Sequence, residues 1–420
     1  MKNIKLLVIV FFVLALYLSP VLAAEKFNYK MAESVHSNSK GSFYRSASPD
    51  ETLKNITGGK VRNVILCIGD GMGFNHVTLA RHKSVGPNRK LHMERLPIAG
   101  VMRTHSTSSL ITDSAAAVTA MASGVKTNNG MIGMTPDKTP HSSILELLIA
   151  DRWRSGLVAT SAITHATPAG FASYVDQRSK QVEIASQMLT NQVDVLLGGG
   201  QKFFLPKGIG KGVREDNLNL LVEAGQRGYQ LIETRQQLLA LKQFPVLGLF
   251  ADEGMTTFAP EPSLAEMTRT GIKLLSAENS GWFAKKPKFF MMIEGSQIDW
   301  AAHANDTDRV IRQTLLFDMA VRETIEFAQR DRHTLVIVTS DHETGGLVLK
   351  EKDGVICPEW TSASHTAADV PVYAFGPDSE RFAGVMDNTD LPKRISELTG
   401  FKEFPVARKQ SQVLEEVSIK

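Results

Sequence analysis

Six short apolar runs, separated by segments with helical patterns, constrain the fold of this chain more than any other feature. They are Val61–Ile68, Gly156–Ala162, Val193–Leu197, Phe289–Ile293, Thr334–Val338 and Val370–Phe375. Continuous apolar runs of this length are typical of strands buried on both faces of a parallel sheet. The clearest helical segments are Ser143–Ala150, Leu218–Ala224 and Asp306–Gln329, while Gln201–Lys288 is expected to be scaffold. The sequence therefore predicts an α/β fold with a largely parallel central sheet and helices on both faces.

The first 23 residues have the three-part layout of a secretory signal. Lys2 and Lys5 precede an apolar run that ends at Leu18, and small residues up to Ala23 close the segment. The apolar run is shorter than the roughly 20 residues that a membrane-spanning helix needs. We therefore expect export to the periplasm or the extracellular space, with no membrane association after cleavage. Residues 24–59 are expected to be a polar surface arm or a poorly ordered leader, and residues 60–420 a single domain.

The charge balance of the chain bears on its possible partners. The chain has 47 lysines and arginines against 44 aspartates and glutamates, a formal net charge of +3. A chain so close to neutrality gives no reason to expect a nucleic acid or an anionic membrane as its partner. Cys67 lies inside an apolar run, so it is expected to be a buried thiol rather than a disulfide partner of Cys357.

Polar residues follow four of the predicted strands at the point where each strand ends. Asp70, Thr167, Glu294, Asp341 and His342 all lie in such segments. The carboxyl ends of strands in an open parallel sheet meet at one edge, so these residues are expected to converge there. Each residue alone could have a structural role, such as capping a turn. Several carboxylates held together would repel one another, and bound divalent cations would remove that conflict.

A second set of metal-ligand residue types lies just beyond the Glu294 strand. Asp299 and His303 are four residues apart, which places both side chains on one face of a helix. An Asp-His pair with this spacing suits zinc, although it could also be an ordinary surface pair. His365 lies in a polar segment and is a further candidate, because such a cluster needs imidazoles.

Ser114 is the candidate nucleophile. It precedes an Ala-rich segment that Gly124 closes, which predicts a helix with Ser114 at or next to its N-terminus. The free N–H groups and the dipole at a helix N-terminus favour an anion such as a phosphoryl group. The alternative is that Asp113 or Ser114 only caps the helix.

At these residues the chain resembles the alkaline phosphatase family, from about Asn63 to Pro377. The segment Asp113-Ser114-Ala115-Ala116 is similar to the family's phosphoserine motif, and the other matching motifs occur in the family's order. The resemblance implies hydrolysis of small phosphate monoesters through a phosphorylated Ser114, with release of inorganic phosphate. It also implies a homodimer.

The resemblance further implies a role for each site residue. Two zinc ions and one magnesium ion are expected, and Arg178 would grip the phosphate. The implied ligands are Asp299, His303 and His365 for one zinc; Asp70, Asp341 and His342 for the other; and Asp70, Thr167 and Glu294 for magnesium.

The sequence departs from the family's pattern in three places. Val118 stands where the motif usually has Gly or Ala. His165 and Trp300 replace an Asp and a Lys that enterobacterial members have near the metals, which puts magnesium as the third occupant in doubt. The 18 residues between Gly346 and His365 leave no room for the large crown insertion of animal members. A dimer would then depend on the main domain or the N-terminal arm.

Three other functions are weighed against this one. A phosphodiesterase of the same superfamily commonly has a threonine nucleophile and lacks the third metal site, so Ser114, Thr167 and Glu294 favour monoesters. A sulfatase would need a Cys/Ser-x-Pro-x-Arg pattern, which the residues after Ser114 lack. A non-catalytic metal- or phosphate-binding protein would not need the complete ligand set.

Overall fold

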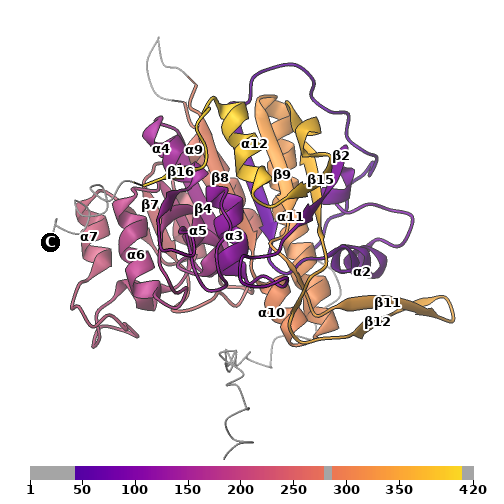
Figure 1. The fold of residues 1–420 in the computed structure, drawn as a ribbon, viewed down its shortest axis with the longest axis horizontal. Coiled ribbons are helices and arrows are strands. Elements are labelled where there is room, and N and C mark those ends of the chain that lie inside the picture. Colours follow the sequence, from indigo (N-terminus) through magenta and orange to yellow (C-terminus); the bar gives the residue numbers. More distant parts are fainter. Residues whose placement is uncertain (1–42, 279–285, 409–420) are drawn as a thin grey trace, which may run out of the picture. The chain divides into compact units, whose positions relative to one another are not determined.

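The computed structural model describes residues 43–278 and 286–408, and its centre is a ten-stranded mixed sheet (Figure 1). In spatial order the strands are β15 (Gly384–Asp387), β2 (Ile98–Arg103), β14 (Val370–Phe375), β9 (Thr334–Thr339), β1 (Asn63–Gly69), β8 (Phe289–Gly295), β4 (Arg154–Ala162), β5 (Val195–Gly199), β7 (Val246–Leu249) and β6 (Gln230–Ile232). Neighbouring strands are parallel, except that β14 is antiparallel to both β2 and β9. The predicted α/β fold with a largely parallel sheet is confirmed.

All six predicted apolar runs form strands of this sheet, namely β1, β4, β5, β8, β9 and β14. Four strands were not predicted, and they lie in pairs at the two edges: β15 and β2 at one, β7 and β6 at the other. β15 and β6 each have two exposed residues and one buried residue among their first three, so they lack a continuous apolar run. β6 and β7 fall in the segment that the sequence assigned to scaffold.

Smaller elements complete the described chain. Three two-stranded pairs are β10 (Glu343–Thr344) with β13 (His365–Thr366), β11 (Leu347–Lys352) with β12 (Val355–Trp360), and β16 (Val406–Ala407) with β3 (His141–Ser142). Short 3₁₀ turns occur at η2 (Met93–Arg95), η3 (Gln201–Phe204) and η4 (Ser379–Phe382). The β11–β12 hairpin extends away from the central sheet (Figure 1) and lies in the short segment between Gly346 and His365.

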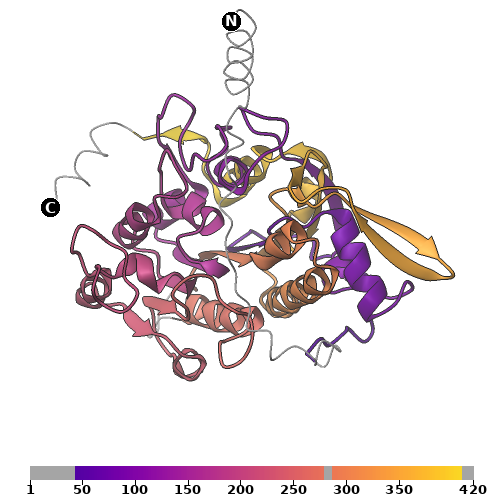
Figure 2. The same cartoon turned by 90° about the horizontal axis from the view of Figure 1, so that it is seen from below.

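Alternate residues of the central strands face two separate hydrophobic cores, as the period of a strand requires. Val64 and Leu66 of β1 belong to the first core, and Ile65 and Cys67 to the second. The first core is covered by α3 (Ser114–Ser123), α4 (Ile144–Ala150), α5 (Ala166–Ala172), α6 (Gln181–Thr190), α7 (Leu220–Gln226) and α12 (Asp390–Thr399). The second is covered by α2 (Phe74–Ser84), α8 (Arg235–Ala240), α9 (Leu264–Ser276) and α11 (Thr307–Asp331) (Figure 2). Helices on both faces are thus confirmed.

The described part of the predicted N-terminal arm is anchored to the domain. The Tyr44 hydroxyl donates a 2.7 Å hydrogen bond to Asp318 of α11, and Leu53 is buried. The predicted signal lies outside the described residues. Among the residues that are described, no helix is long and apolar enough to cross a membrane. Both cysteines are free thiols, and Cys67 is buried as expected.

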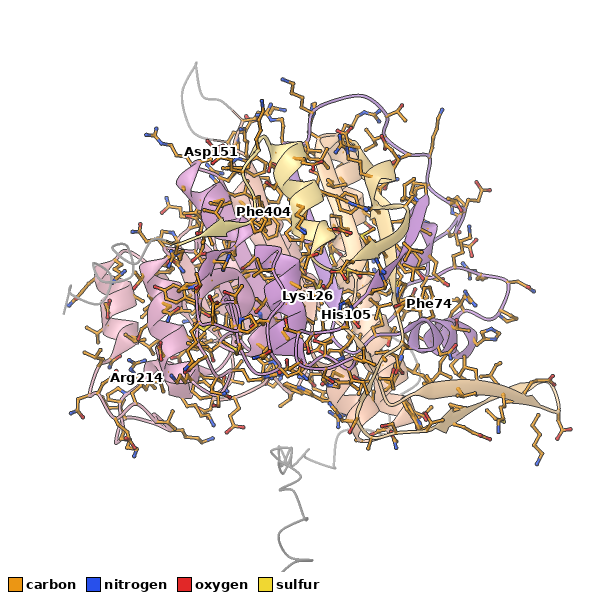
Figure 3. All side chains as sticks on the ribbon, in the orientation of Figure 1. Phe74, His105, Lys126, Asp151, Arg214 and Phe404 are labelled. Carbon is orange, nitrogen blue, oxygen red and sulfur yellow. The ribbon has the colours of Figure 1, made fainter. Side chains whose placement is uncertain are left out.

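Close packing at two points fixes helix α3. At its C-terminal end, Gly124 has a left-handed backbone, and a Cβ on Gly124 would lie 2.8 Å from the ring of Phe404. Phe404 is labelled in Figure 3. On its flank, Val118 fills the space above Gly170 of α5. A Cβ on Gly170 would lie 2.6 Å from Val118 Cγ1. The unusual Val118 is therefore accommodated because α5 has a glycine opposite.

This contact predicts that Gly170→Ala destabilises the protein although alanine favours a helix. Overpacking a dense core costs about 1–3 kcal/mol, which outweighs the gain of up to about 1 kcal/mol from replacing a helical glycine. Adding Val118→Ala should restore most of the loss, and thermal unfolding of the two single variants and the double variant measures this coupling. Simple additivity of the two effects would show that the two side chains do not share this space.

Candidate active site

Three groups of side chains lie at the carboxyl edge of the sheet, and within each group the potential metal-ligand atoms lie within 4.8 Å of one another. Group one is Asp299, His303 and His365; group two is Asp70, Asp341 and His342; group three is Asp70, His165 and Glu294. These residues lie at or just after the ends of β1, β4, β8 and β9, on α10 (Gln297–His303) and in β13. The convergence expected from the sequence is therefore present, and Asp70 joins groups two and three.

Group one contains the helical pair that the spacing predicted. His303 Nε2 lies 3.3 Å and His365 Nε2 3.5 Å from Asp299 Oδ1, and the two imidazole nitrogens are 3.1 Å apart. The other ring nitrogen of each histidine bonds a backbone carbonyl: His303 Nδ1 that of Ala363 at 2.7 Å, and His365 Nδ1 that of Thr112 at 2.8 Å. Since a carbonyl only accepts, each Nδ1 carries a proton, so each imidazole in its neutral form has its Nε2 lone pair directed at the group and open to a cation.

Group two is entirely buried. His342 Nε2 lies 3.1 Å from Asp341 Oδ2 and 3.6 Å from Asp70 Oδ1. The backbone N–H groups of Gly71 and His342 donate to Asp341 Oδ1, which leaves Oδ2 for the group. Burial, followed by the charges of Asp341, Asp299 and Glu294, raises the pKa of Asp70 well above its usual range. The site is therefore crowded with negative charge.

Group three includes His165, which the sequence analysis had identified only as a departure from the family's pattern. The sequence placed Thr167 and Glu294 with Asp70, and the structure brings His165 to the same point. Burial lowers the pKa of His165 to about 3, and Arg178 acts in the same direction, so its imidazole is neutral. Burial also raises the pKa of Glu294 to about 7, against the effect of the Ser296 hydroxyl. His165 lies three residues after the end of β4, so it follows a strand end as the predicted ligands do. That position was the signal in the sequence that could have identified it as a member of the site.

Several buried oxygen and nitrogen atoms of these residues have no hydrogen-bond partner, which indicates whether the residues fit bound cations. Within the described residues, the buried atoms without a hydrogen-bond partner include Asp70 Oδ1 and Oδ2, Asp341 Oδ2, Glu294 Oε1, Thr167 Oγ1 and His165 Nδ1. Buried polar groups in native proteins are nearly always paired, so a set of unpaired ligand atoms in one place requires an explanation. The donor set of carboxylates, imidazoles and a hydroxyl fits divalent cations.

Ser114 is the first residue of α3, as predicted, and it does not cap the helix. Asp113 is the cap, because its Oδ1 accepts a 2.9 Å hydrogen bond from the N–H of Ala116. The Ser114 hydroxyl instead lies 3.2 Å from His342 Nε2 of group two. The serine is therefore available for chemistry beside group two and at a helix N-terminus.

Arg178 approaches the same place from the segment between α5 and α6. Its Nη1 donates to Asp113 Oδ2 at 3.2 Å, and its Nη2 lies 3.2 Å from His165 Nε2. The backbone N–H of Arg178 donates to the carbonyl of Gly130, whose own N–H donates to Asp113. The guanidinium is thus held against Asp113, the residue before Ser114, and its planar fork has the shape to bind two oxygens of an anion such as phosphate.

A largely parallel sheet with three metal-ligand groups at its carboxyl edge, one of them beside a serine at a helix N-terminus, is typical of a metal-dependent hydrolase of the α/β class. The family model for alkaline phosphatase matches residues 61–357 and 355–401. Alkaline phosphatase 4 of Bacillus subtilis is 35% identical over 79% of this chain and 87% of its own length, and the Escherichia coli alkaline phosphatase is 31% identical over 81% and 86%. The structure of alkaline phosphatase from the Antarctic bacterium TAB5 superimposes with a TM-score of 0.73 at 33% identity, over 82% of this chain and 99% of that one.

The chain belongs to the alkaline phosphatase family. It is accordingly a metal-dependent phosphoric monoester hydrolase, with groups one to three as its candidate metal sites. A variant of the TAB5 enzyme, in which an aspartate replaces a histidine, was solved with magnesium bound at a metal site.

The crowded carboxylates predict opposite effects of Asp70→Asn with and without metal. Without metal, the neutral amide relieves repulsion in a buried site, so the variant should unfold at a higher temperature than the wild type. With saturating zinc, the variant lacks one ligand and should unfold at a lower temperature than the wild type. Its free energy of unfolding should then be lower by at least about 1 kcal/mol. Thermal unfolding in chelator and in excess zinc measures both.

Asp353→Asn is the matched control, because Asp353 is exposed in the turn between β11 and β12 and belongs to none of the three groups. It should change neither unfolding temperature appreciably. If Asp70→Asn destabilised the metal-free protein, repulsion at the site would not be its dominant interaction.

Proposed function

We propose that phosphate monoesters are hydrolysed through a phosphorylated Ser114, with zinc at groups one and two and magnesium at group three. The observation that carries the proposal is the Ser114 hydroxyl, 3.2 Å from His342 of group two and at the start of α3. Histidine and aspartate are common zinc ligands, which supports zinc at groups one and two. The Asp70 and Glu294 carboxylates and the Thr167 hydroxyl are oxygen donors of the kind magnesium prefers, and His165 is the exception.

Cations bound at these groups would stabilise negative charge on Ser114 Oγ and on the leaving oxygen. The protein itself positions the serine and the phosphoryl group. Asp113 takes up one N–H of the first turn of α3 and leaves Ser114 Oγ free to approach the phosphorus atom. A phosphoryl group at this helix N-terminus also meets the favourable end of the helix dipole.

Arg178 is proposed to bind two oxygens of the phosphoryl group. Asp113 and His165 hold its guanidinium from two sides, so little side-chain freedom remains to be lost when the substrate binds. A bidentate contact would orient the phosphorus for in-line attack. This role explains why the arginine is fixed beside Ser114 rather than extended into solvent.

Two displacements complete the proposed reaction. In the first, the bond between Ser114 Oγ and phosphorus forms while the bond from phosphorus to the ester oxygen breaks, and the departing alcohol gains the proton that the serine lost. In the second, water attacks the phosphoserine, inorganic phosphate leaves, and the serine hydroxyl is restored. Small phosphorylated compounds are the proposed substrates.

The serine and the third group favour monoesters over diesters. A phosphodiesterase of the superfamily would commonly have a threonine nucleophile and no third site, whereas this chain has Ser114 and the residues of group three. Two features therefore support the same choice.

Ser114→Ala should lower kcat for p-nitrophenyl phosphate by about 10³-fold or more, because the covalent route is lost. Chelation should abolish the wild-type activity, and added zinc should restore it. The matched control is Ser123→Ala, at the other end of the same helix and equally buried, which should keep most of its activity. Full activity in the Ser114 variant would refute the phosphoserine route.

His165→Asp should increase the affinity of group three for magnesium, since a carboxylate oxygen replaces an imidazole. The relative solved with magnesium after a histidine-to-aspartate change supports this expectation. Metal analysis after dialysis against magnesium, together with the magnesium dependence of activity, measures the effect. His165→Asn has a similar shape without charge, and it should not gain magnesium; equal gains in both variants would contradict the reason given.

Two features outside the site are also proposed. Residues 1–23 are removed during export to the periplasm or the extracellular space, leaving an N-terminal arm up to residue 59 and a single catalytic domain from residue 60, which N-terminal sequencing of the exported protein would test. The enzyme is a homodimer, as the family resemblance implies, and sedimentation equilibrium would test that state.

A further inference from the structure

The hydroxyl of Thr344 lies between group one and group two. Thr344 belongs to β10, two residues after His342, and it is fully buried. Its Oγ1 is 2.5 Å from Asp299 Oδ1 of group one and 3.3 Å from His342 Nδ1 of group two. One side chain outside both groups therefore contacts a member of each.

The directions of these two hydrogen bonds follow from the chemistry of the partners. An ionised carboxylate only accepts, so the single hydroxyl proton of Thr344 is donated to Asp299. The oxygen then has lone pairs only for His342, whose Nδ1 must donate. His342 Nε2 consequently presents its lone pair to group two.

His342 differs in this respect from the other two candidate zinc-binding histidines. His303 and His365 are each oriented by a backbone carbonyl. The Nδ1 of His342 instead meets a side-chain hydroxyl, and that hydroxyl is itself bonded to Asp299 of group one. The orientation of a ligand in one group thus depends on a ligand of the other.

The backbone around Thr344 leaves the hydroxyl little room to move. The N–H of Thr344 donates to the carbonyl of Gly71 at 3.1 Å, and Thr344 pairs with His365 across β10 and β13. Gly71 has a φ of +73°, and a Cβ on it would lie 2.8 Å from Thr344 Oγ1. The hydroxyl is therefore confined between Gly71, Asp299 and His342.

We propose that Thr344 is a positioning residue that couples the two zinc groups, so that a cation in one group favours a cation in the other. The inference rests on the proposed function, because it takes groups one and two as zinc sites. A cation at group one fixes Asp299, which fixes the hydroxyl, which in turn holds His342 ready for group two. Outer hydrogen-bond partners of metal ligands typically change metal affinity by about 10–100-fold.

Thr344→Val removes the hydroxyl and keeps the shape, whereas Thr344→Ser keeps the hydroxyl. The matched control is Thr366→Val, on the paired strand β13, whose hydroxyl bonds Glu343 rather than a member of the groups. Zinc binding is measured by competition with a chelator of known affinity. We expect Thr344→Val to weaken both zinc sites by about 10-fold or more and to replace joint loss of the two ions with two separate steps. The wild type, Thr344→Ser and Thr366→Val should all lose both ions together.

Cadmium-113 NMR of the cadmium-loaded proteins provides a second measurement that does not depend on activity. Thr344→Val should shift the resonances of both sites, and Thr366→Val should shift neither appreciably. If Thr344→Val does not fold, as judged by circular dichroism, Thr344→Ala takes its place. Equal zinc affinity and unchanged resonances in a hydroxyl-free variant would overturn the coupling alone, whereas a wild type that binds no zinc at these groups would overturn the proposed function itself.

Discussion

Repulsion among buried carboxylates is the interaction on which the rest of this structure depends. Asp70 is fully buried and faces Asp341, Asp299 and Glu294, whose charges add to the cost of its burial. Asp70 and Asp341 follow the ends of β1 and β9, whereas Glu294 lies in β8 and Asp299 in α10. The repulsion therefore acts between separate elements of the fold. The fold can sustain this repulsion because apolar cores on both faces of the sheet fix those elements. Cations bound at the candidate sites would replace the repulsion with attraction.

Backbone atoms orient three of the six candidate ligands in groups one and two. Carbonyls of Ala363 and Thr112 hold two imidazoles, and backbone N–H groups hold one oxygen of Asp341. Backbone atoms keep their positions when neighbouring side chains change rotamer, so they are suited to preserving a site before any cation binds. His342 and Asp299 instead contact the side-chain hydroxyl of Thr344. Thr344 therefore orients one candidate ligand in each of the two groups.

The sequence predicted the centre of the fold better than its edges, for a physical reason. Strands buried on both faces must be continuously apolar, so all six central runs were recognisable, whereas edge strands such as β15 and β6 face solvent and have no such pattern. The site was predicted through residue types and strand ends. The role of Val118 was not, because the space it fills is created by Gly170 on another helix, and pairing of that kind is set by tertiary packing alone.

The candidate ligands are widely spaced along the chain, so binding of a cation at the site is coupled to the stability of the fold. Group one joins α10 to the segment around His365, and group two joins the end of β1 to the end of β9. A cation in either group therefore closes a long loop of chain, so its binding energy also stabilises the arrangement of the strands. β10 lies where these two closures meet, since it follows β9 directly and pairs with the strand that begins at His365. A contact at this position can transmit the state of one closure to the other without any larger movement of the sheet.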